Sequence, residues 1–525
     1  MPSIVEAVAK GIMDEQRKYS LSNSEVDLPQ NEIFKYLAQG ERGLTKLLVQ
    51  AGKDKFVSDS ASKKWYFWDD NSWSEDRTQS VYRMLPEILV KSLRKLDKQI
   101  SGIENKEDKK TKEEVLKTAL KKLDNIDSAN RLVNAAAKGH YCPNKESSDT
   151  VEGLGLEGDE WDRHPYLIGF PNGVLDMRTG GFRLGQPQDF IKDTIPFEWR
   201  GWEEQAPTFS KFLESILPKD PNKPELGGDK EVIACLQRCL GHSFRGCIKE
   251  HKLVILAGEK GRNGKTTLME AIKSSLGDGY VYAANSGLLT EQSFTRSGSA
   301  PSPDKMALRN KRIVYASEVK RGATMDCEQV KHLTGGDSIT ARNCFDRHDV
   351  TFEPTQQLVL IANDIPQIAY DDAAMWYRLL IFKFQLSFVD DPKESYERKA
   401  DPELLEKLKK ETSGIITWVL KGCMEYKRQG INPPESVKAS VREFQIKNDV
   451  LGLFISEALI KDQNASIAAS ALYAAYKRWA LDSGFPQKDI MTSTSFGTKI
   501  KERIARDKAK GSMVYKGYRL PKQTK

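Results

Sequence analysis

A glycine-rich loop lies between an apolar run and a helical pattern at residues 253–272, LVILAGEKGRNGKTTLMEAI. Strand, loop and helix in this order are the context that a phosphate-binding loop needs. Glycines let backbone amides face phosphate oxygens, Lys265 neutralises the β- and γ-phosphates, and the Thr266 hydroxyl reaches Mg²⁺. Glu259 departs from the strict pattern, which has glycine there. The expected cofactors are ATP and Mg²⁺, and the expected nucleotide-binding residues are Gly258, Gly261, Asn263, Gly264, Lys265, Thr266 and Thr267.

Three further side chains stand at the ends of apolar runs and suit the same chemistry. Glu318 ends RIVYASE and is predicted to hold Mg²⁺ together with Thr266 and to orient the attacking water. Asn363 ends LVLIAN, where its amide can bond the γ-phosphate or that water. Arg378 precedes LLIFKF, and a guanidinium can stabilise phosphate oxygens in the transition state. The plainer alternatives are a surface Glu, an Asn turn before Pro366 and an ordinary charged residue before a strand.

Residues 333–358 read as two β-runs that flank a charged tip. The tip holds Arg342, Arg347 and His348, and Lys331 lies one helix earlier as a weaker candidate. Cations on such a hairpin can bind phosphates of a nucleic acid without reading its sequence. The alternative is an exposed hairpin with scattered charge.

The elements that must position these residues form an α/β pattern. From His251 onward the apolar runs LVILA, RIVYA, LVLIA and LLIFKF alternate with helical segments, which predicts a buried and mostly parallel sheet. Residues 402–460 read as helical again. The last 65 or so residues read as two helices and a hairpin, a pattern consistent with a winged helix.

The region before this α/β pattern is mixed. Lys63–Trp73, KKWYFWDDNSW, reads as a β-hairpin whose aromatic rings either pack in a core, which we favour, or stack on bases. Residues 91–138 predict a pair of solvated helices, and residues 142–160 predict a linker. Phe170–Leu184 reads as strand, turn and strand.

Composition bounds the function. The chain has 525 residues, 39% of them hydrophobic, which excludes a wholly disordered protein. It shows neither a membrane span nor a secretory signal, and its seven Cys suit a reducing compartment, so we expect a cytoplasmic protein. Residues 499–525 hold ten Lys/Arg and two Asp/Glu, a surplus of 10 − 2 = 8 against a net charge of +7. Lys499, Lys501 and Arg503 are therefore candidate DNA contacts, with a solvated basic tail as the alternative.

The order of the motifs is more specific than any one of them. GEKGRNGKTT, RIVYASE, VKHLTGGDSITAR, LVLIANDIP and DDAAMWYRLLIFKF together resemble the phage/plasmid primase-helicase family, which shares its superfamily 3 helicase core with poxvirus primase-helicases. WYFWDDNSW, NGVLDMRTG, CLQRCLGHSFRG and the C-terminal segments resemble further parts of that family. The resemblance covers most of the chain from about residue 36.

The resemblance implies a multidomain α/β protein with an AAA+-like P-loop ATPase core, a helical or mixed N-terminal region and a C-terminal winged helix. The expected units are 1–140 (N-terminal α+β), 141–245 (pre-helicase collar), 246–390 (superfamily 3 ATPase), 391–460 (helical subdomain) and 461–525 (basic winged-helix-like DNA-binding module).

The resemblance also implies a ring, usually a homo-hexamer, with a catalytic set of Lys265, Glu318, Asn363 and Arg378. Arg378 then acts on the ATP of a neighbouring subunit, and the charged hairpin points into a central pore. The family often has two adjacent arginines at this point, whereas this chain has Tyr377-Arg378, so a second trans-acting cation is missing from the motif.

Two kinds of site, a primase site and a zinc site, are not expected. A primase site commonly uses an Asp-x-Asp pair to hold metals, and the sequence contains none. The run Cys235, Cys239, His242, Cys247 and His251 lacks paired zinc-ligand spacing, so buried thiols on a helix are the better interpretation.

The hypothesis is an ATP-dependent, ring-forming DNA helicase that replicates a phage, plasmid or other mobile element, in a bacterial host cell or at a viral replication site. The partners expected are single-stranded and forked DNA and a separate primase or polymerase, and no membrane. The alternatives are a duplex DNA translocase and an origin-binding initiator that uses ATP as a switch with little turnover.

Overall fold

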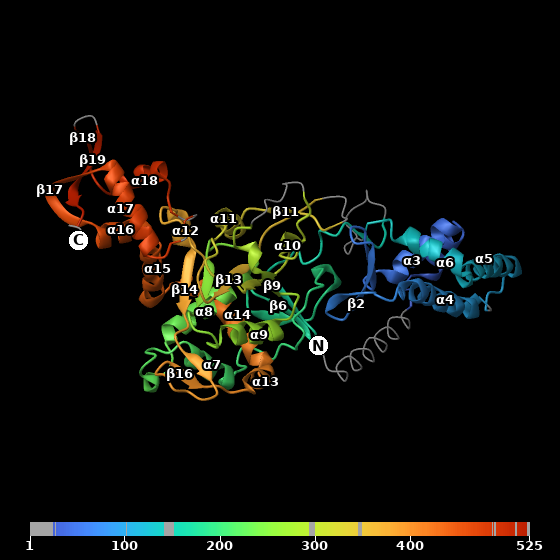
Figure 1. Ribbon diagram of the computed structural model, residues 1–525. Helices are drawn as coiled ribbons and strands as arrows, with labels where there is room; N and C mark the ends of the chain where they lie inside the picture. Colours follow the sequence, from blue (N-terminus) through green and yellow to red (C-terminus); the bar gives the residue numbers. More distant parts are fainter. Residues whose placement is uncertain are drawn as a thin grey trace.

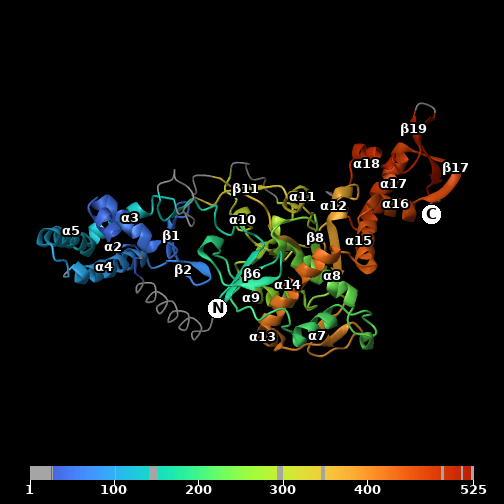
Figure 2. The same ribbon diagram turned by 180° about the vertical axis from the view of Figure 1, so that it is seen from behind.

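The computed structural model describes residues 25–26, 28–100, 102–140, 152–292, 300–344, 349–485, 487, 490–509 and 512–521. A compact central α/β body lies between a helical N-terminal region and a small C-terminal module, and these two lie at opposite ends of the molecule (Figures 1 and 2). The protein is therefore elongated, with the predicted phosphate loop in its middle part.

One parallel sheet forms the centre of the body. Its strands run in the order β14, β8, β13, β10 and β9, and every neighbouring pair is parallel. The strands are rich in Val, Ile and Leu because both faces of the sheet are covered. Their bounds are β8 Leu253–Ala257, β9 Val281–Asn285, β10 Ile313–Ser317, β13 Gln357–Ala362 and β14 Leu379–Lys383. The prediction of a buried, parallel sheet from His251 onward is confirmed.

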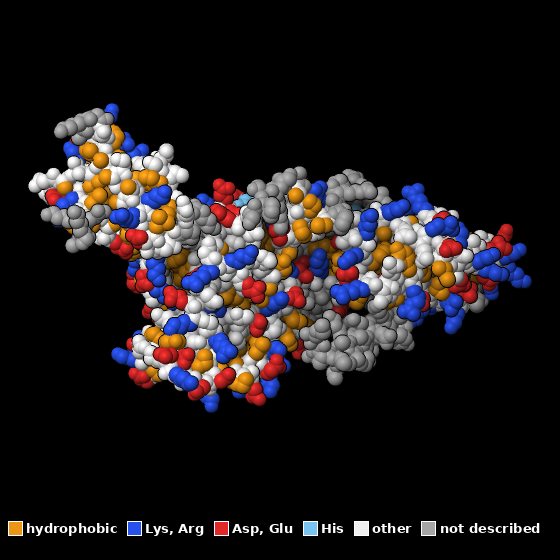
Figure 3. All heavy atoms as spheres, viewed as in Figure 1, with side chains coloured by type: hydrophobic (Ala, Val, Ile, Leu, Met, Phe, Trp, Pro, Cys, Tyr) orange, Lys and Arg blue, Asp and Glu red, His pale blue; other side chains and the backbone are white. Residues whose placement is uncertain are grey.

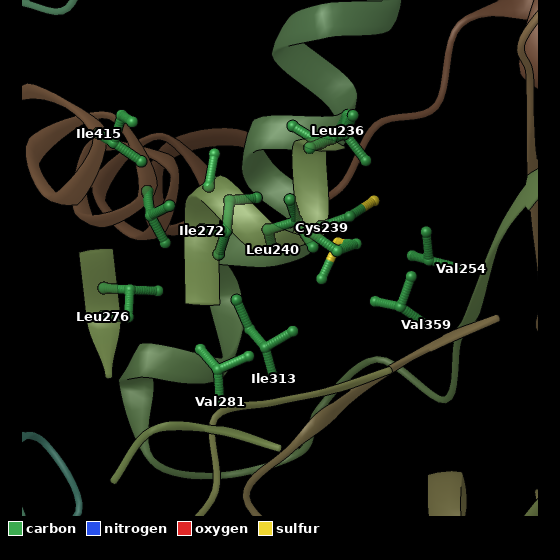
Figure 4. Packing of buried hydrophobic residues seen from close by; sticks show 14 of the residues in the cluster. Leu236, Cys239, Leu240, Val254, Ile272, Leu276, Val281, Ile313, Val359 and Ile415 are labelled. Carbon is green, nitrogen blue, oxygen red and sulfur yellow. The ribbon is translucent and has the colours of Figure 1, made fainter. Parts of the chain in front are cut away.

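Alternate strand residues serve two different cores. Val254 and Leu256 of β8 join one cluster, which includes residues of the helices shown in Figure 4, whereas Leu253 and Ile255 face a second cluster on the other side. Helices of the first side are α7 Pro207–Ile216, α8 Lys230–Gly241, α9 Lys265–Leu276, α13 Leu404–Lys409 and α14 Thr412–Gln429. Those of the second side are α11 Cys327–Gly335 and α12 Ala373–Arg378, and α15 Glu435–Lys447 contributes to both clusters. The first cluster runs from Ile168 to Val437, so the elements before the sheet, the sheet and the helices after it share one core.

Helices α8 and α14 approach each other through glycines. A Cβ atom on Gly422 of α14 would lie 2.1 Å from the Gln237 carbonyl oxygen, and one on Gly241 of α8 would lie 2.4 Å from the Cys423 nitrogen. The backbones therefore touch where no side chain intervenes. This contact fixes the helical subdomain to the collar.

The predicted charged hairpin is formed by β11 Ile339–Ala341 and β12 Val350–Phe352, which pair antiparallel. Residues 345–348 of its tip, Arg347 and His348 among them, lie outside the described residues. Shorter elements complete the body: α10 Pro303–Met306, β15 Ser387–Val389 and β16 Glu397–Lys399.

The N-terminal region is a helical cluster against a small sheet ordered β3-β2-β1-β4. Strands β2 Lys64–Asp69 and β3 Ser72–Glu75 form the predicted hairpin, and the Trp65, Phe67 and Trp73 rings are buried, as the core-packing interpretation requires. The helices, including the predicted solvated pair, are α2 Gln30–Leu37, α3 Glu41–Gly52, α4 Val81–Ile100, α5 Lys106–Asp124 and α6 Ile126–Ala136.

The prediction of a linker over residues 142–160 is wrong in its second half, and residues 142–151 lie outside the described residues. Strand β4 Gly155–Leu156 pairs parallel with β1 Phe56–Asp59 and completes the N-terminal sheet. Two residues are too short a run to give a periodic signal in the sequence. The next segment, β5 Leu167–Phe170, β6 Gly173–Asp176 and β7 Gly181–Arg183, forms an antiparallel sheet that contains the predicted strand, turn and strand.

The C-terminal module has its own core around Phe454, Tyr476 and Phe496. It contains the two predicted helices, α17 Ala469–Asp482 and α18 Ser493–Ile500. The prediction of a hairpin within residues 512–520 is wrong, because this run is the single strand β19 Ser512–Arg519, which pairs antiparallel with β18 Arg506–Ala509. Helix α16 Val450–Ala458 and strand β17 Ile460–Ala468 precede them, and β17 pairs with β19. The polar sequence of β17 hid this strand from the sequence analysis.

The interpretation of Cys235 and Cys239 as buried thiols is confirmed, because both lie on α8 with no exposed surface. The ring of His242 is buried beside them and bonds the Cys239 carbonyl oxygen through Nδ1 at 2.8 Å.

None of the helices in the described ranges combines the length and apolar character needed to cross a bilayer.

Replacing Gly422 tests the contact between α8 and α14. Gly422→Ala is expected to lower the free energy of unfolding by about 1–3 kcal/mol, because the added methyl group must displace backbone atoms. Urea unfolding followed by tryptophan fluorescence measures the change. Gly102→Ala is the control, since its nearest contact would be an ordinary 3.7 Å. Equal midpoints for both variants would contradict the proposed close approach.

Candidate nucleotide site and nucleic-acid contacts

The Lys265 ammonium group is the centre of the candidate site. Gly264 adopts a left-handed conformation with φ of 80° and ends the loop, and α9 begins at Lys265 itself. The side chain of Lys265 is 4% exposed. Its Nζ donates hydrogen bonds to the Gly258 carbonyl oxygen at 3.1 Å, to Asn263 Oδ1 at 2.7 Å and to Asn363 Oδ1 at 3.0 Å. The structure thus joins Lys265 to Asn363, which is 98 residues away in the sequence.

Burial lowers the pKa of Lys265 to about 8, because desolvation penalises the charged ammonium form. The three neighbouring acceptors are neutral oxygens and do not offset this penalty fully. A phosphate anion at the same position would favour the charged form and raise the pKa again. The lysine is therefore suited to an anionic ligand.

The loop glycines differ in what they require. A Cβ atom on Gly258 would lie 2.2 Å from Asn263 Nδ2, and one on Gly264 would lie 2.6 Å from Ile216 Cγ2. Gly261, in contrast, has nothing within 4 Å of such an atom in the described part of the chain. Close packing explains why Gly258 and Gly264 have no side chain. Of these three glycines, Gly261 is the one with open space beside it for a ligand.

The other loop residues line the open side of the site. Thr266 is exposed and Thr267 is partly exposed at the first turn of α9, where the helix dipole favours an anion. Glu259, the departure from the strict pattern, is exposed and lies 3.8 Å from Lys447 of α15. Its carboxylate therefore points toward α15 and does not pair with Lys265.

Glu318 follows β10 at the same edge of the sheet as the phosphate loop, with β13 and Asn363 between the two strands. It is exposed, and its φ of 61° is unusual for a residue other than glycine. The Glu318 carboxylate and the Thr266 hydroxyl supply the hard oxygen ligands that Mg²⁺ prefers. These residues fit the expected metal in chemistry and in their position at one edge.

A cavity of about 390 Å³ adjoins the loop. Its lining includes Gly258 and Lys260 of the loop, Asn363 and Phe384 that follow β13 and β14, and Phe444 of α15. Its volume and mixed lining are those of a small-molecule site. The cavity extends the site from the loop toward the helical subdomain.

Arg378 does not join this group. It ends α12 and precedes β14, whose Leu379 is in register with Leu253, so it lies at the opposite edge of the sheet from the loop that follows Ala257. The length of the strand separates these edges by about 13 Å. Its Nη1 donates to the Ala374 carbonyl oxygen at 2.8 Å, and its buried Nε has no partner among the described residues. Within one chain it cannot serve the same site.

Lys252 is a cation at this second edge that the sequence analysis missed. Its Nζ donates to the Tyr377 carbonyl oxygen at 2.6 Å and lies 3.8 Å from the centre of the Tyr377 ring. Desolvation lowers the pKa of Lys252, and the nearby charge of Arg378 contributes in the same direction. The signal was present in the sequence only as a lysine before a strand.

The two predicted DNA contacts of the hairpin region that the structure describes, Arg342 and Lys331, are paired with acidic side chains. The Arg342 guanidinium lies 3.7 Å from Asp349 across the hairpin. Lys331 of α11 bonds Asp372 at 3.0 Å, and Asp372 also caps α12 by accepting from the Met375 amide. Lys331 therefore fastens α12 rather than standing free.

Two of the three C-terminal candidates for DNA contacts are also paired with acidic side chains. Lys499 of α18 forms an ion pair of 2.9 Å with Asp371, and this partner lowers the pKa of Asp371. Arg503 pairs with Asp449 at 2.6 Å and lies over the Tyr370 ring at 4.6 Å. Lys501 is exposed. Two of the three thus dock the C-terminal module on the central body.

Comparison with known proteins gives two family matches. Residues 44–218 match the model described as D5 N terminal like, and residues 446–518 match the model described as Poxvirus D5 protein-like. The solved structure of the "NrS-1 C terminal region-CTR" aligns with 90% of this chain and 98% of its own, at 12% identity and a TM-score of 0.46.

Relatives occur in large DNA viruses. The chain is 29% identical over 458 residues to "Putative helicase L207/L206" of Acanthamoeba polyphaga mimivirus, which covers 83% of this chain and 45% of the relative. It is 25% identical over 354 residues to "Putative primase C962R" of African swine fever virus, which covers 61% of this chain and 33% of the relative. The chain thus spans less than half of the length of these two relatives. These two matches and the viral relatives agree with the resemblance of the motif order to the poxvirus-related primase-helicase family.

Proposed function

We propose that the protein is an ATP-dependent DNA helicase of superfamily 3 that acts in replication of a large DNA virus, a phage or another mobile element. One observation carries the proposal: the buried Lys265 ammonium group lies 3.0 Å from Asn363 Oδ1 at the carboxyl edge of the parallel sheet. This is where ligands bind in open α/β sheets. The relatives that bear the names helicase and primase support the same class of activity.

In this proposal each residue of the site has a defined task. Lys265 and the amides of the loop hold the ATP phosphates, and Thr266 with Glu318 holds Mg²⁺, which neutralises charge during phosphoryl transfer. Glu318 also orients the attacking water, and Asn363 contacts the γ-phosphate or that water. The 390 Å³ cavity next to the loop has room for the base of the nucleotide.

The separation of Arg378 from this group supports a ring. Because Arg378 lies at the opposite edge of the sheet, it serves the ATP of a neighbouring subunit, and a homo-hexamer is the proposed assembly. Lys252, which lies against Tyr377, is the proposed second cation at that interface. In members of the family with two adjacent arginines at this point, the second arginine has this role.

The DNA contacts are proposed at the hairpin and the C-terminal module. The hairpin of β11 and β12 carries its cations into the pore, and ATP hydrolysis moves it along one strand. The two helices and hairpin of the C-terminal module support a winged helix that recruits DNA or a replication partner. A separate primase or polymerase supplies synthesis, since primase activity is not proposed for this chain.

Strand displacement is the direct test of the proposal. The wild-type protein with ATP and Mg²⁺ is expected to unwind forked DNA duplexes, and Lys265→Ala is expected to show none, because it removes the phosphate-binding cation. Forks with either a 3′ or a 5′ tail give the polarity of movement.

Other outcomes of that assay favour the alternatives. ATPase activity that responds to duplex but not to single strands, without unwinding, supports a duplex translocase. Specific origin binding that survives Lys265→Ala, with negligible wild-type turnover, supports an initiator that uses ATP as a switch. Primer synthesis by the pure protein would contradict the absence of primase activity.

The low pKa of Lys265 predicts proton uptake on ATP binding. In the free protein the ammonium loses its proton through a pKa of about 8, and the bound phosphates raise that pKa. Binding at pH 8 is therefore expected to take up about half a proton, and the affinity should weaken as the pH rises above 8. Isothermal titration calorimetry in buffers of different ionisation enthalpy measures the uptake. Identical heats in all buffers at pH 8 would rule out the linkage.

Complementation tests the shared site. Arg378→Ala alone is expected to lower the ATPase kcat by about 10³-fold, as expected for loss of an arginine finger. In an equal mixture with Lys265→Ala, random assembly restores about a quarter of the interfaces, since one variant supplies the loop and the other supplies the arginine. ATPase assays of the two variants, separately and mixed, measure this. Activity in the mixture no higher than in either variant alone would exclude a site shared between subunits.

A further inference from the structure

A second and larger cavity lies in the N-terminal region, far along the chain from the phosphate loop. Its volume is about 640 Å³. The turn after β1, the start of β2, the turn before α4 and the C-terminal end of α6 surround it. Surface charge alone does not mark this cavity, because basic and acidic side chains are interspersed over the N-terminal helices (Figure 3).

Three cations on the cavity wall are free. Lys63, Arg77 and Lys138 are exposed, and their side chains make no hydrogen bond or ion pair within the described ranges. They come from three separate segments of the chain, namely the β1–β2 turn, the β3–α4 connection and the end of α6. The cavity is where these segments meet, so the charges surround one space.

The acidic residues of the same wall are already engaged. Glu75 forms an ion pair of 3.0 Å with Lys64. Asp59 is buried and accepts from the Ser62 hydroxyl at 2.7 Å and from Trp161 Nε1 at 3.1 Å. Asp76 is buried and accepts from the Val81 amide at 2.8 Å. The four Lys/Arg of the wall outnumber its three carboxylates, a surplus of 4 − 3 = 1, and the two buried carboxylates face donors of the protein itself.

The two buried carboxylates also fix the positions of the cations. Asp59 accepts from the Ala61 and Ser62 amides and so shapes the turn that carries Lys63. Asp76 accepts from the Ser80 hydroxyl and the Val81 amide and so shapes the turn that carries Arg77. A binding site whose turns are held in advance loses less entropy when a ligand binds.

Groups that suit nucleic acid complete the wall. The Tyr82 hydroxyl donates to Asn134 Oδ1 at 2.7 Å, and the Tyr82 ring lies edge-on to Trp65 at 6.5 Å. Gln79 and Asn134 offer amide groups at the rim. Cations that follow a backbone, together with an aromatic ring and adaptable amides, are the means by which single strands are held without sequence preference.

We propose that this cavity binds the phosphate backbone of single-stranded DNA through Lys63, Arg77 and Lys138. This inference rests on the proposed helicase function and adds a second contact with the strand, separate from the hairpin and the C-terminal module. The N-terminal region then holds the strand while the central body moves it.

The test compares two triple variants of the full chain. The cavity variant is Lys63→Ala, Arg77→Ala and Lys138→Ala. The control is Lys110→Ala, Lys117→Ala and Lys121→Ala, which removes the same charge from exposed positions of α5 in the same region. All six side chains are exposed, so both variants should keep the thermal stability of the wild type.

Fluorescence anisotropy with a labelled oligothymidine, measured across a series of KCl concentrations, gives the readout. In the cavity variant the slope of log K against log salt is expected to become shallower by about 2, since three phosphate contacts are lost. The control should keep the wild-type slope, and the basal ATPase should be unchanged in both. Equal slopes in the two variants overturn the inference.

Two further outcomes are distinguishable. Absence of oligothymidine binding by the wild type itself would count against the proposed function rather than against the cavity alone. If the cavity variant keeps the DNA slope but loses binding of polyglutamate, the cavity accepts an acidic peptide and the inference fails.

Discussion

A buried positive charge is the constraint on which the site depends. The Lys265 ammonium group is nearly inaccessible, and it is held by oxygens from the start of the loop, from within the loop and from the end of β13. Such burial costs free energy unless an anion is available, which the lowered pKa of the lysine also reflects. The loop, the first turn of α9 and the neighbouring strand are all arranged around this one group.

The parallel sheet divides the chemistry between its two edges. The strand ends that carry Lys265, Glu318 and Asn363 meet at the carboxyl edge, whereas Arg378 and Lys252 precede their strands at the amino edge. Parallel pairing in register enforces this division, since Leu253 faces Leu379 and Ala257 faces Lys383. In the proposed ring, these two groups form one site between neighbouring copies of the chain.

Sequence reasoning succeeded where local pattern decides the structure. Apolar runs that end in a single polar residue identified the strands before Glu318 and Asn363, and glycine spacing identified the loop. It did not predict that Asn363 contacts Lys265, because the position of β13 between β8 and β10 depends on tertiary packing. The pairing of Lys499 with Asp371 was equally hidden, since the two residues are far apart in the chain and either could have faced solvent.

The short helix α12 has a mechanical consequence. Its N-terminal end is held on two sides, because Lys331 bonds its capping Asp372 and Lys499 pairs with the adjacent Asp371. Its other end carries Arg378. Six residues make a rigid arm of about 9 Å. Because β14 begins directly after Arg378, and Met375 and Trp376 are buried in the second core, this arm is held at both ends. The position of the guanidinium is therefore coupled to the sheet, to the hairpin side and to the C-terminal module at once.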